Sequence, residues 1–394
     1  MQYDARSSLP TPDALSAAHS ERVVEFIRAE MAAAGGSLSF AEFMQHALYA
    51  PGLGYYAAGA TKFGAAGDFV TAPEVSSLFG RVLARQCAEV LAAMNDGSIL
   101  EVGAGSGKLA ADVLGALAAM DKLPGRYEIL EVSADLRQRQ EDYLRAKQPD
   151  LISLVSWLDR PPGTHDGVII ANEVIDALPV ERFLRAAREV RQMRVTAESK
   201  AFGVTDVEAP DVLVRTVEGI EDELGVQLPE GYVSEVSLGM PAWLVELAGC
   251  LRCGVAFLMD YGVTRREYYA PQRAGGWLRC HFRHHAHDDP LILVGIQDLT
   301  AWADFTAVAA AGLACGLDVA GYSAQAQFLI GGGLEFELQQ LADLSTTAQL
   351  EMSGQVKILT LPGEMGENFK CLALRRGDVP VPSAFALGDR THTL

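Results

Sequence analysis

The feature that most constrains the fold is a glycine-rich turn between a short strand and a helix. Ile99 to Val102 has the pattern of a buried strand, and apolar residues at helical spacing follow over Leu109 to Met120. Between them, Gly103, Gly105 and Gly107 occupy every second position. Glycine permits a positive φ and a close approach of the backbone to a ligand. The N–H groups and the dipole at the start of a helix favour a polar or anionic group there.

Two phosphate-binding motifs are excluded at individual positions of this turn. A P-loop requires Gly where Val102 stands and Ser or Thr where Leu109 stands. The dinucleotide fingerprint requires Gly at the position of Lys108. The pattern from Glu101 to Gly107 instead suits an adenosyl ligand with a charged amino-acid tail and no pyrophosphate.

An acidic residue at the end of the next strand supports this interpretation. Tyr127 to Val132 is strand-like and carries Glu131, roughly 20 residues beyond the glycines, where folds of this kind place a carboxylate on ribose hydroxyls. The alternative is that Glu131 only terminates its strand. Because Glu131 follows the glycine turn at this spacing, we expect Glu131, Glu101 and the three glycines to bind the cofactor.

Alternation of strands and helices along the middle of the chain predicts an α/β fold with a parallel sheet. Two late strands, Val356 to Leu361 and Phe369 to Leu374, suggest an antiparallel end to this sheet. The expected segments are a helical N-terminal region, a sheet domain in two parts, a β-rich insertion on the substrate side and a loose tail. The N-terminal region spans 1–75, the sheet domain spans 76–182 and 252–376, the insertion spans 183–251, and the tail spans 377–394.

Composition narrows the classes of protein and partner. A net charge of −19 over 394 residues argues against nucleic acid as the main partner and fits a basic protein or peptide better. No apolar run reaches the ~20 residues of a spanning helix, and the first 20 residues have neither a secretory nor a transit pattern. We therefore expect a cytoplasmic chain without a membrane span, with six reduced cysteines.

Several motifs in one order resemble the MidA-like methyltransferases over about Phe40 to Leu374. They are Gly67-Asp-Phe-Val-Thr-Ala-Pro-Glu74, Glu101-Val-Gly-Ala-Gly-Ser-Gly107, Leu130-Glu-Val-Ser133, Ala171-Asn-Glu-Val-Ile-Asp-Ala-Leu-Pro-Val180, Met259-Asp-Tyr-Gly262, Gln297-Asp-Leu-Thr-Ala-Trp-Ala-Asp-Phe305 and Gly366-Glu-Asn-Phe369. The resemblance implies a Rossmann-like methyltransferase sheet with an antiparallel strand at its end, and S-adenosylmethionine as cofactor. Mitochondrial members methylate an arginine of a respiratory complex I subunit, which implies a protein partner and a possible respiratory-complex substrate. The missing transit pattern fits a bacterial homologue and leaves the acceptor open.

The segment after the strand Val168 to Ala171 supplies the catalytic candidates. Ligands bind at the carboxyl edge of open α/β sheets, and Asn172 and Glu173 come directly after this strand. A carboxylate can grip a guanidinium with two hydrogen bonds, so Glu173 is the first catalytic candidate and Asp176 the second. Asp176 is equally suited to building the turn before Pro179.

Further binding candidates follow from the resemblance and from strand ends. Asp68 and Thr71, in the glycine-rich N-terminal loop, are expected to contact the cofactor together with Asn172. Asp260 ends another sheet strand, where it either lines the acceptor pocket or caps the turn. The His-rich segment 280–289 invites a zinc hypothesis, but Cys250 and Cys253 have no second C-x-x-C, so we expect no metal ion.

Three functions remain possible at this stage. The first is a methyltransferase acting on an arginine of a partner protein, and the second is a small-molecule methyltransferase. The third is a non-catalytic assembly factor that binds the cofactor only for structure. An open acidic groove would favour a protein acceptor, whereas a closed apolar pocket would favour a small one.

Overall fold

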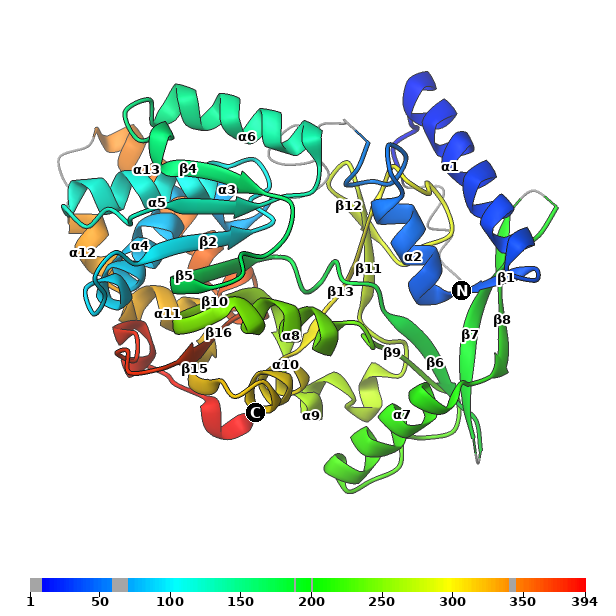
Figure 1. The fold of residues 1–394 in the computed structure, drawn as a ribbon. Coiled ribbons are helices and arrows are strands. Elements are labelled where there is room, and N and C mark those ends of the chain that lie inside the picture. The colour runs from blue at the N-terminus through cyan, green and yellow to red at the C-terminus, as the bar shows by residue number, and fades with distance from the viewer. Residues whose placement is uncertain (1–8, 59–69, 188, 200, 340–344) are drawn as a thin grey trace. The chain divides into compact units, whose positions relative to one another are not determined.

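The structure, a computed structural model, describes residues 9–58, 70–187, 189–199, 201–339 and 345–394. These residues form two compact units (Figure 1). The first unit contains the described N-terminal residues up to 58, Asp176–Met240 and Thr264–Trp302. The second contains Val70–Ile175, Pro241–Val263 and Ala303–Leu394. In the described parts of the chain, no helix has both the length and the apolarity needed to cross a membrane.

The second unit is built on an eight-stranded sheet in the order β15-β16-β10-β5-β2-β3-β4, with β14 paired to β10. Its strands are β2 (Ser98–Val102), β3 (Tyr127–Leu130), β4 (Val155–Leu158), β5 (His165–Asn172), β10 (Leu251–Val263), β14 (Ala303–Asp304), β15 (Asp318–Ala324) and β16 (Phe369–Arg376). The pairs from β4 to β10 and the β10–β14 pair are parallel. Only β16 runs against its neighbours, β10 and β15. This arrangement confirms the predicted methyltransferase-type sheet.

Helices cover this sheet because its central strands are apolar on both faces. Consecutive residues of β5, Val168, Ile169 and Ile170, are all fully buried, which is typical of a parallel strand between two helical layers. The helices are α3 (Ala72–Val75), α4 (Ser77–Leu91), α5 (Lys108–Ala119), α6 (Ala134–Lys147), α8 (Met240–Cys250), α10 (Phe305–Ala314), α11 (Gln325–Gly331), α12 (Leu334–Gln339), α13 (Thr346–Thr360) and α14 (Met365–Asn368). Short 3-10 helices are η3 (Ile152–Leu154), η5 (Ser383–Ala386) and η6 (Thr391–Thr393). Figure 1 shows β2, β3 and β4 side by side, with α5 and α6 beside them.

The order of the strands creates a topological switch point between β2 and β5. From β2 the chain proceeds through β3 and β4 towards one edge, and from β5 through β10 towards the other. Open α/β sheets bind ligands at the carboxyl ends of the strands on either side of such a point. The glycine turn follows β2 and Asn172 ends β5, so both lie at this position.

The first unit is antiparallel and contains the N-terminal helices. A five-stranded sheet has the order β1-β7-β6-β9 with β8 paired to β7, and a second sheet has the order β12-β11-β13. The strands are β1 (Ser37–Ser39), β6 (Glu181–Arg185), β7 (Val190–Ala197), β8 (Phe202–Glu208), β9 (Tyr232–Val236), β11 (Leu278–Phe282), β12 (His285–His287) and β13 (Asp298–Ala301). The helical elements are α1 (Ala14–Ala33), α2 (Phe40–Tyr49), α7 (Asp211–Leu224), α9 (Arg265–Tyr268) and η4 (Pro271–Arg273). A capping box between Ser39 and Glu42 starts α2.

The observed units differ from the predicted segments at several boundaries. Residues 70–75, predicted in the N-terminal region, belong to the second unit, and residues 176–182, predicted in the sheet domain, belong to the first. Residues 264–302, predicted within the sheet domain, belong to the first unit, where β11, β12 and β13 make a separate sheet. The helix α8, predicted within the insertion 183–251, belongs almost entirely to the second unit. That the N-terminal region 1–75 covers the cofactor site stays a prediction.

The predicted terminal hairpin is wrong. Val356 to Leu361 lies almost entirely in the helix α13. The strand β16 pairs instead with β15, and the helices α11 to α14 lie between these two strands in the sequence. A short apolar run does not distinguish a strand from a buried helix by periodicity, which explains the error.

The predicted loose tail is also wrong, because residues 377–394 pack on the core of the second unit. Ala384 is fully buried and Phe385 is 4% exposed, with its ring edge-on to Phe328 at 5.5 Å between centroids. The Ala384 N–H donates to Gln86 Oε1 at 2.8 Å, and the Arg390 N–H donates to the Tyr322 carbonyl at 2.6 Å.

We predict that Phe385→Ala lowers the free energy of unfolding by about 3 kcal/mol, because it removes a buried aromatic ring. Leu387→Ala, at a residue of the same tail that is 48% exposed, should cost less than about 1 kcal/mol. Urea denaturation followed by circular dichroism measures both. Equal, small losses in the two variants would show that the tail is not part of the folded core.

Candidate cofactor and methyl-transfer site

The register of three parallel strands brings the predicted cofactor residues to one edge of the sheet. Val102 of β2 pairs with Leu130 of β3 and with Ala171 of β5. The next residues, Gly103, Glu131 and Asn172, therefore leave the sheet at the same level. The structure thus brings together the glycine turn, the acidic residue and Asn172.

The glycine turn has the backbone that its sequence predicts. Gly103, Gly105 and Gly107 have φ values of 67°, 53° and 82°, a region in which side chains are strained. Gly107 is the N-cap of α5, so this helix begins without a capping side chain. The Ser106 hydroxyl accepts a hydrogen bond from the Lys108 N–H at 3.3 Å. The turn therefore presents backbone groups at a helix N-terminus, as an adenosyl ligand with a charged tail requires.

Glu131 is held in place by its neighbours at the end of β3. Its Oε1 accepts from the Ser133 N–H at 2.9 Å, and its Oε2 accepts from Gln140 Nε2 at 3.2 Å. Burial raises the pKa of Glu131, while these hydrogen bonds oppose the shift. A fixed carboxylate at this position is suited to accepting hydrogen bonds from ribose hydroxyls.

Gln140 links the acid to the glycine turn, and sequence reasoning missed it. This residue of α6 is fully buried, and its Nε2 donates both to Glu131 and to the Gly105 carbonyl, the latter at 3.1 Å. Its Oε1 accepts from Trp157 Nε1 at 2.9 Å, which orients the amide. A signal was present, because Gln140 lies midway between Leu136 and Leu144 on the buried stripe of α6.

Glu101 lies beneath the turn, inside the sheet. It is 2% exposed, and the Tyr127 hydroxyl donates to its Oε2 at 2.6 Å. Burial raises the pKa of Glu101 to about 7, with the Tyr127 hydrogen bond opposing the shift. This placement indicates that Glu101 stabilises the end of β2 before the turn. Direct contact between Glu101 and the cofactor stays a prediction.

Asn172 and Glu173 extend the site on the β5 side. Asn172 Nδ2 donates to Glu173 Oε1 at 3.1 Å. Asn172 Oδ1 is buried and has no hydrogen-bond partner among the residues that the structure describes. A buried acceptor without a donor is costly, so a donor from a bound ligand would satisfy it.

Glu173 has a left-handed backbone with φ of 54°, which is unusual for a side chain of this size. Its N–H donates to the Met259 carbonyl at 2.8 Å, and Asp260 Oδ2 accepts from the N–H groups of Val174 and Ile175 at 3.1 and 2.8 Å. Asp260 is fully buried, so of its two predicted roles the structure supports the one in the turn. These bonds stabilise the strained turn that presents the Glu173 carboxylate.

The remaining predicted residues are less closely tied to this site. Thr71 is the N-cap of α3, and Asp68 lies outside the described residues. Asp176 belongs to the first unit, where it is 6% exposed and its carbonyl accepts from the Ala301 N–H at 2.9 Å. The pKa of Tyr56 is raised mainly by burial, then by the charges of Asp298 and Tyr49, and then by Asp176. A catalytic role for Asp176 and cofactor contacts for Thr71 and Asp68 stay predictions.

The His-rich segment forms β11 and β12 of the first unit, with Cys280 opposite His287 in the ladder. In the described ranges, no group of three or more His, Cys, Asp or Glu side chains is arranged to hold a metal ion. The six cysteines are unpaired thiols.

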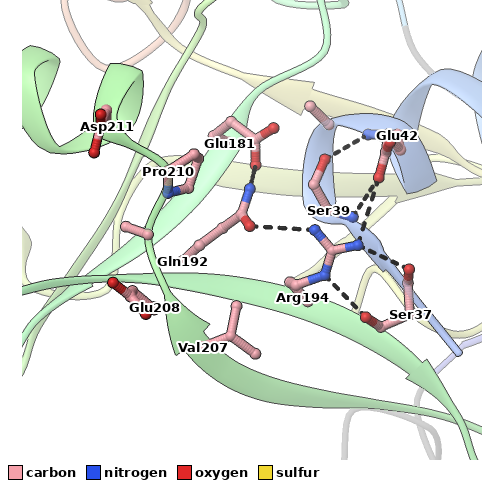
Figure 2. Close-up of a pocket in the computed structure, with 12 residues that line it drawn as sticks. Ser37, Ser39, Glu42, Glu181, Gln192, Arg194, Val207, Glu208, Pro210 and Asp211 are labelled. Atoms are coloured by element: carbon pink, nitrogen blue, oxygen red, sulfur yellow. Dashed lines mark hydrogen bonds and ion pairs between the residues drawn. The ribbon is translucent and has the colours of Figure 1, made fainter. Parts of the chain in front are cut away.

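The first unit also contains an acidic pocket of about 810 Å³ (Figure 2). Its carboxylates come from Glu42, Glu181, Glu208 and Asp211. Its cation, Arg194, is bonded to the hydroxyl and carbonyl of Ser37, at 2.9 and 2.8 Å, and to Gln192 Oε1 at 3.2 Å. None of the glycine-turn residues lines this pocket.

Comparison with known proteins identifies the family. The model of a family of S-adenosyl-L-methionine-dependent methyltransferases matches residues 82–323, more than half of the chain. This chain belongs to that family. A protein of Burkholderia thailandensis, solved with S-adenosyl-homocysteine bound, is 42% identical, with a TM-score of 0.92 over 98% of this chain and 100% of that one.

Curated relatives of this methyltransferase are more distant. Protein arginine methyltransferase NDUFAF7, mitochondrial, of Danio rerio is 28% identical over 371 residues, 86% of this chain and 83% of that protein. The homologue of Drosophila melanogaster is 28% identical over 374 residues, 87% of this chain and 82% of that protein.

Family membership makes S-adenosylmethionine the cofactor of this methyltransferase, and the residues present fit it. The glycine turn lies at the N-terminus of α5, and Glu131 has oxygens suited to ribose hydroxyls. Among the described residues, the buried Asn172 Oδ1 has no hydrogen-bond donor, which a bound ligand could supply. The cofactor supplies a methyl group carried on a sulfonium.

We predict that stability depends on pH through Glu101. Its pKa is raised to about 7 in the folded chain, so the folded state loses stability as pH rises from about 4.5 to 7 and changes little on this account above that range. Glu101→Gln removes this loss, which is on the order of 3 kcal/mol. Chemical denaturation at several pH values measures the difference between the two proteins. A difference that is independent of pH, as expected for the exposed control Glu351→Gln, would contradict the buried ionisable carboxyl.

Proposed function

We propose that this methyltransferase transfers a methyl group to an arginine side chain of a partner protein. The observation that carries the proposal is the Glu173 carboxylate, fixed at the carboxyl end of β5 beside the glycine turn of β2. The printed names of the curated relatives, which are protein arginine methyltransferases, support the same acceptor chemistry.

Glu173 has the chemistry that an arginine acceptor requires. Transfer to a guanidinium nitrogen would form an N–C bond as the S–C bond of the sulfonium breaks, would leave S-adenosyl-homocysteine, and would release one proton. The guanidinium must therefore be held and its lost proton accepted. A carboxylate binds a guanidinium through two parallel hydrogen bonds and stabilises the positive charge. Because Glu173 Oε1 is positioned by the Ala72 N–H at 3.3 Å and by Asn172 Nδ2, the carboxylate is oriented before the acceptor arrives.

The acidic pocket of the first unit supports a protein acceptor over a small apolar molecule. Four carboxylates against one guanidinium, together with a net charge of −19, complement a positively charged polypeptide. A respiratory-complex subunit is the acceptor to test first, since the resemblance implies it. A cytoplasmic location also remains our proposal, although the curated relatives are mitochondrial by name.

We predict that Glu173→Gln keeps affinity for S-adenosyl-homocysteine but lowers methyl transfer by at least about 100-fold. Glutamine retains the Oε1 acceptor for Ala72 and Asn172 but loses the charge that grips the guanidinium and takes up its proton. Calorimetry measures the affinity, and transfer of a labelled methyl group measures the rate. Full activity in this variant would remove Glu173 from the mechanism.

The acceptor class is tested with labelled S-adenosylmethionine, the purified chain and an extract of cells that lack it. We expect label in protein, located by mass spectrometry as methylarginine, with Glu173→Gln as the inactive control. Label confined to small molecules would establish the alternative methyltransferase. Cofactor binding without any transfer would favour the non-catalytic assembly factor.

A further inference from the structure

The short helix α3 contacts both sides of the cofactor site. On one side, the Ser106 hydroxyl of the glycine turn donates to Glu74 Oε1, and Lys108 Nζ donates to the Pro73 carbonyl. On the other side, the Ala72 N–H donates to Glu173 Oε1 at 3.3 Å. Three consecutive residues therefore connect the turn after β2 with the turn after β5.

This connection adds to two bonds that already restrain the turn, from the Gly107 N–H to the Ala104 carbonyl at 2.8 Å and from Gln140 to the Gly105 carbonyl at 3.1 Å. Ser106 lies between Gly105 and Gly107, two residues that adopt many backbone conformations at little cost. The Ser106 hydroxyl donates to Glu74 and also accepts from the Lys108 N–H, so it ties the carboxylate to the first N–H of α5. A hydrogen bond to a charged group is stronger than one between neutral groups, which suits a contact that must restrain a loop.

Glu74 is itself anchored to the body of the second unit. The carbonyl of Thr71, the N-cap of α3, accepts from the N–H groups of Glu74 and Val75 at 2.9 and 3.1 Å. Ala72 is fully buried in the hydrophobic core of the second unit, and Pro73 is also buried. The carboxylate therefore extends from a fixed backbone, and its position defines where Ser106 lies.

We propose that Glu74 is a positioning residue for S-adenosylmethionine. Acting through Ser106, it holds the glycine turn in the conformation that binds the cofactor, and α3 sets the turn in place relative to Glu173. This role depends only on the family's cofactor and is independent of the acceptor proposed above.

The test is a double-mutant cycle on affinity for S-adenosyl-homocysteine, measured by calorimetry on the full chain. Ser106→Ala and Glu74→Ala should each weaken binding about tenfold, because either one releases the turn. The double variant should bind no more than about twofold more weakly than Ser106→Ala, since the bond between Ser106 and Glu74 is already absent in that single variant. Glu74→Gln should weaken binding less than Glu74→Ala does, because its amide oxygen can still accept from the Ser106 hydroxyl but without the charge that strengthens the bond.

A matched control exists in the same unit. Ser383 Oγ donates to Glu89 Oε1 at 2.5 Å, which is the same pair of residue types away from the glycine turn. Ser383→Ala and Glu89→Ala should leave the affinity within twofold of the wild type, while thermal melts show that all variants are folded. Single variants at Glu74 and Ser106 that bind normally, losses that multiply in the double variant, or equal losses in the controls would overturn the proposal.

Discussion

The site depends on one constraint, which is that β2, β3 and β5 end at the same level of a parallel sheet. This register places Gly103, Glu131 and Asn172 at a common edge without any contact between distant side chains. The switch point between β2 and β5 leaves room there for a ligand, since the chain departs in opposite directions from the two strands. A shift of β3 or β5 by one residue would move its terminal side chain to the other face of the sheet and separate the group.

Polar side chains, of which Gln140 and Asp260 are buried, then contact the segments that leave the strands. Gln140 joins Glu131 to the carbonyl of Gly105, Asp260 holds the turn after Glu173, and Glu74 reaches Ser106. The hydrogen bonds of Gln140 and Asp260 satisfy polar groups in a low-dielectric interior, where an unpaired group is costly. The strain at Glu173 is tolerated because the surrounding bonds determine its backbone.

Local pattern is sufficient to predict the sheet, the glycine turn and the position of Asn172 and Glu173. These features depend on neighbouring residues or on strand ends, which spacing in the sequence reveals. Gln140 and Glu74 were missed because their partners lie 35 and 32 residues away, and a polar residue on a helix resembles a solvated one. The strand assigned to Val356–Leu361 failed because a short apolar run in α13 has no decisive period.

The most direct test is a crystal structure of this chain with S-adenosyl-homocysteine. The account predicts the amino-acid tail and the adenosyl group against Gly103 to Gly107, the ribose hydroxyls on Glu131, and the Asn172 Oδ1 atom within hydrogen-bond distance of a donor on the ligand. A ligand bound away from the glycine turn, or a ribose that does not contact Glu131, would contradict it.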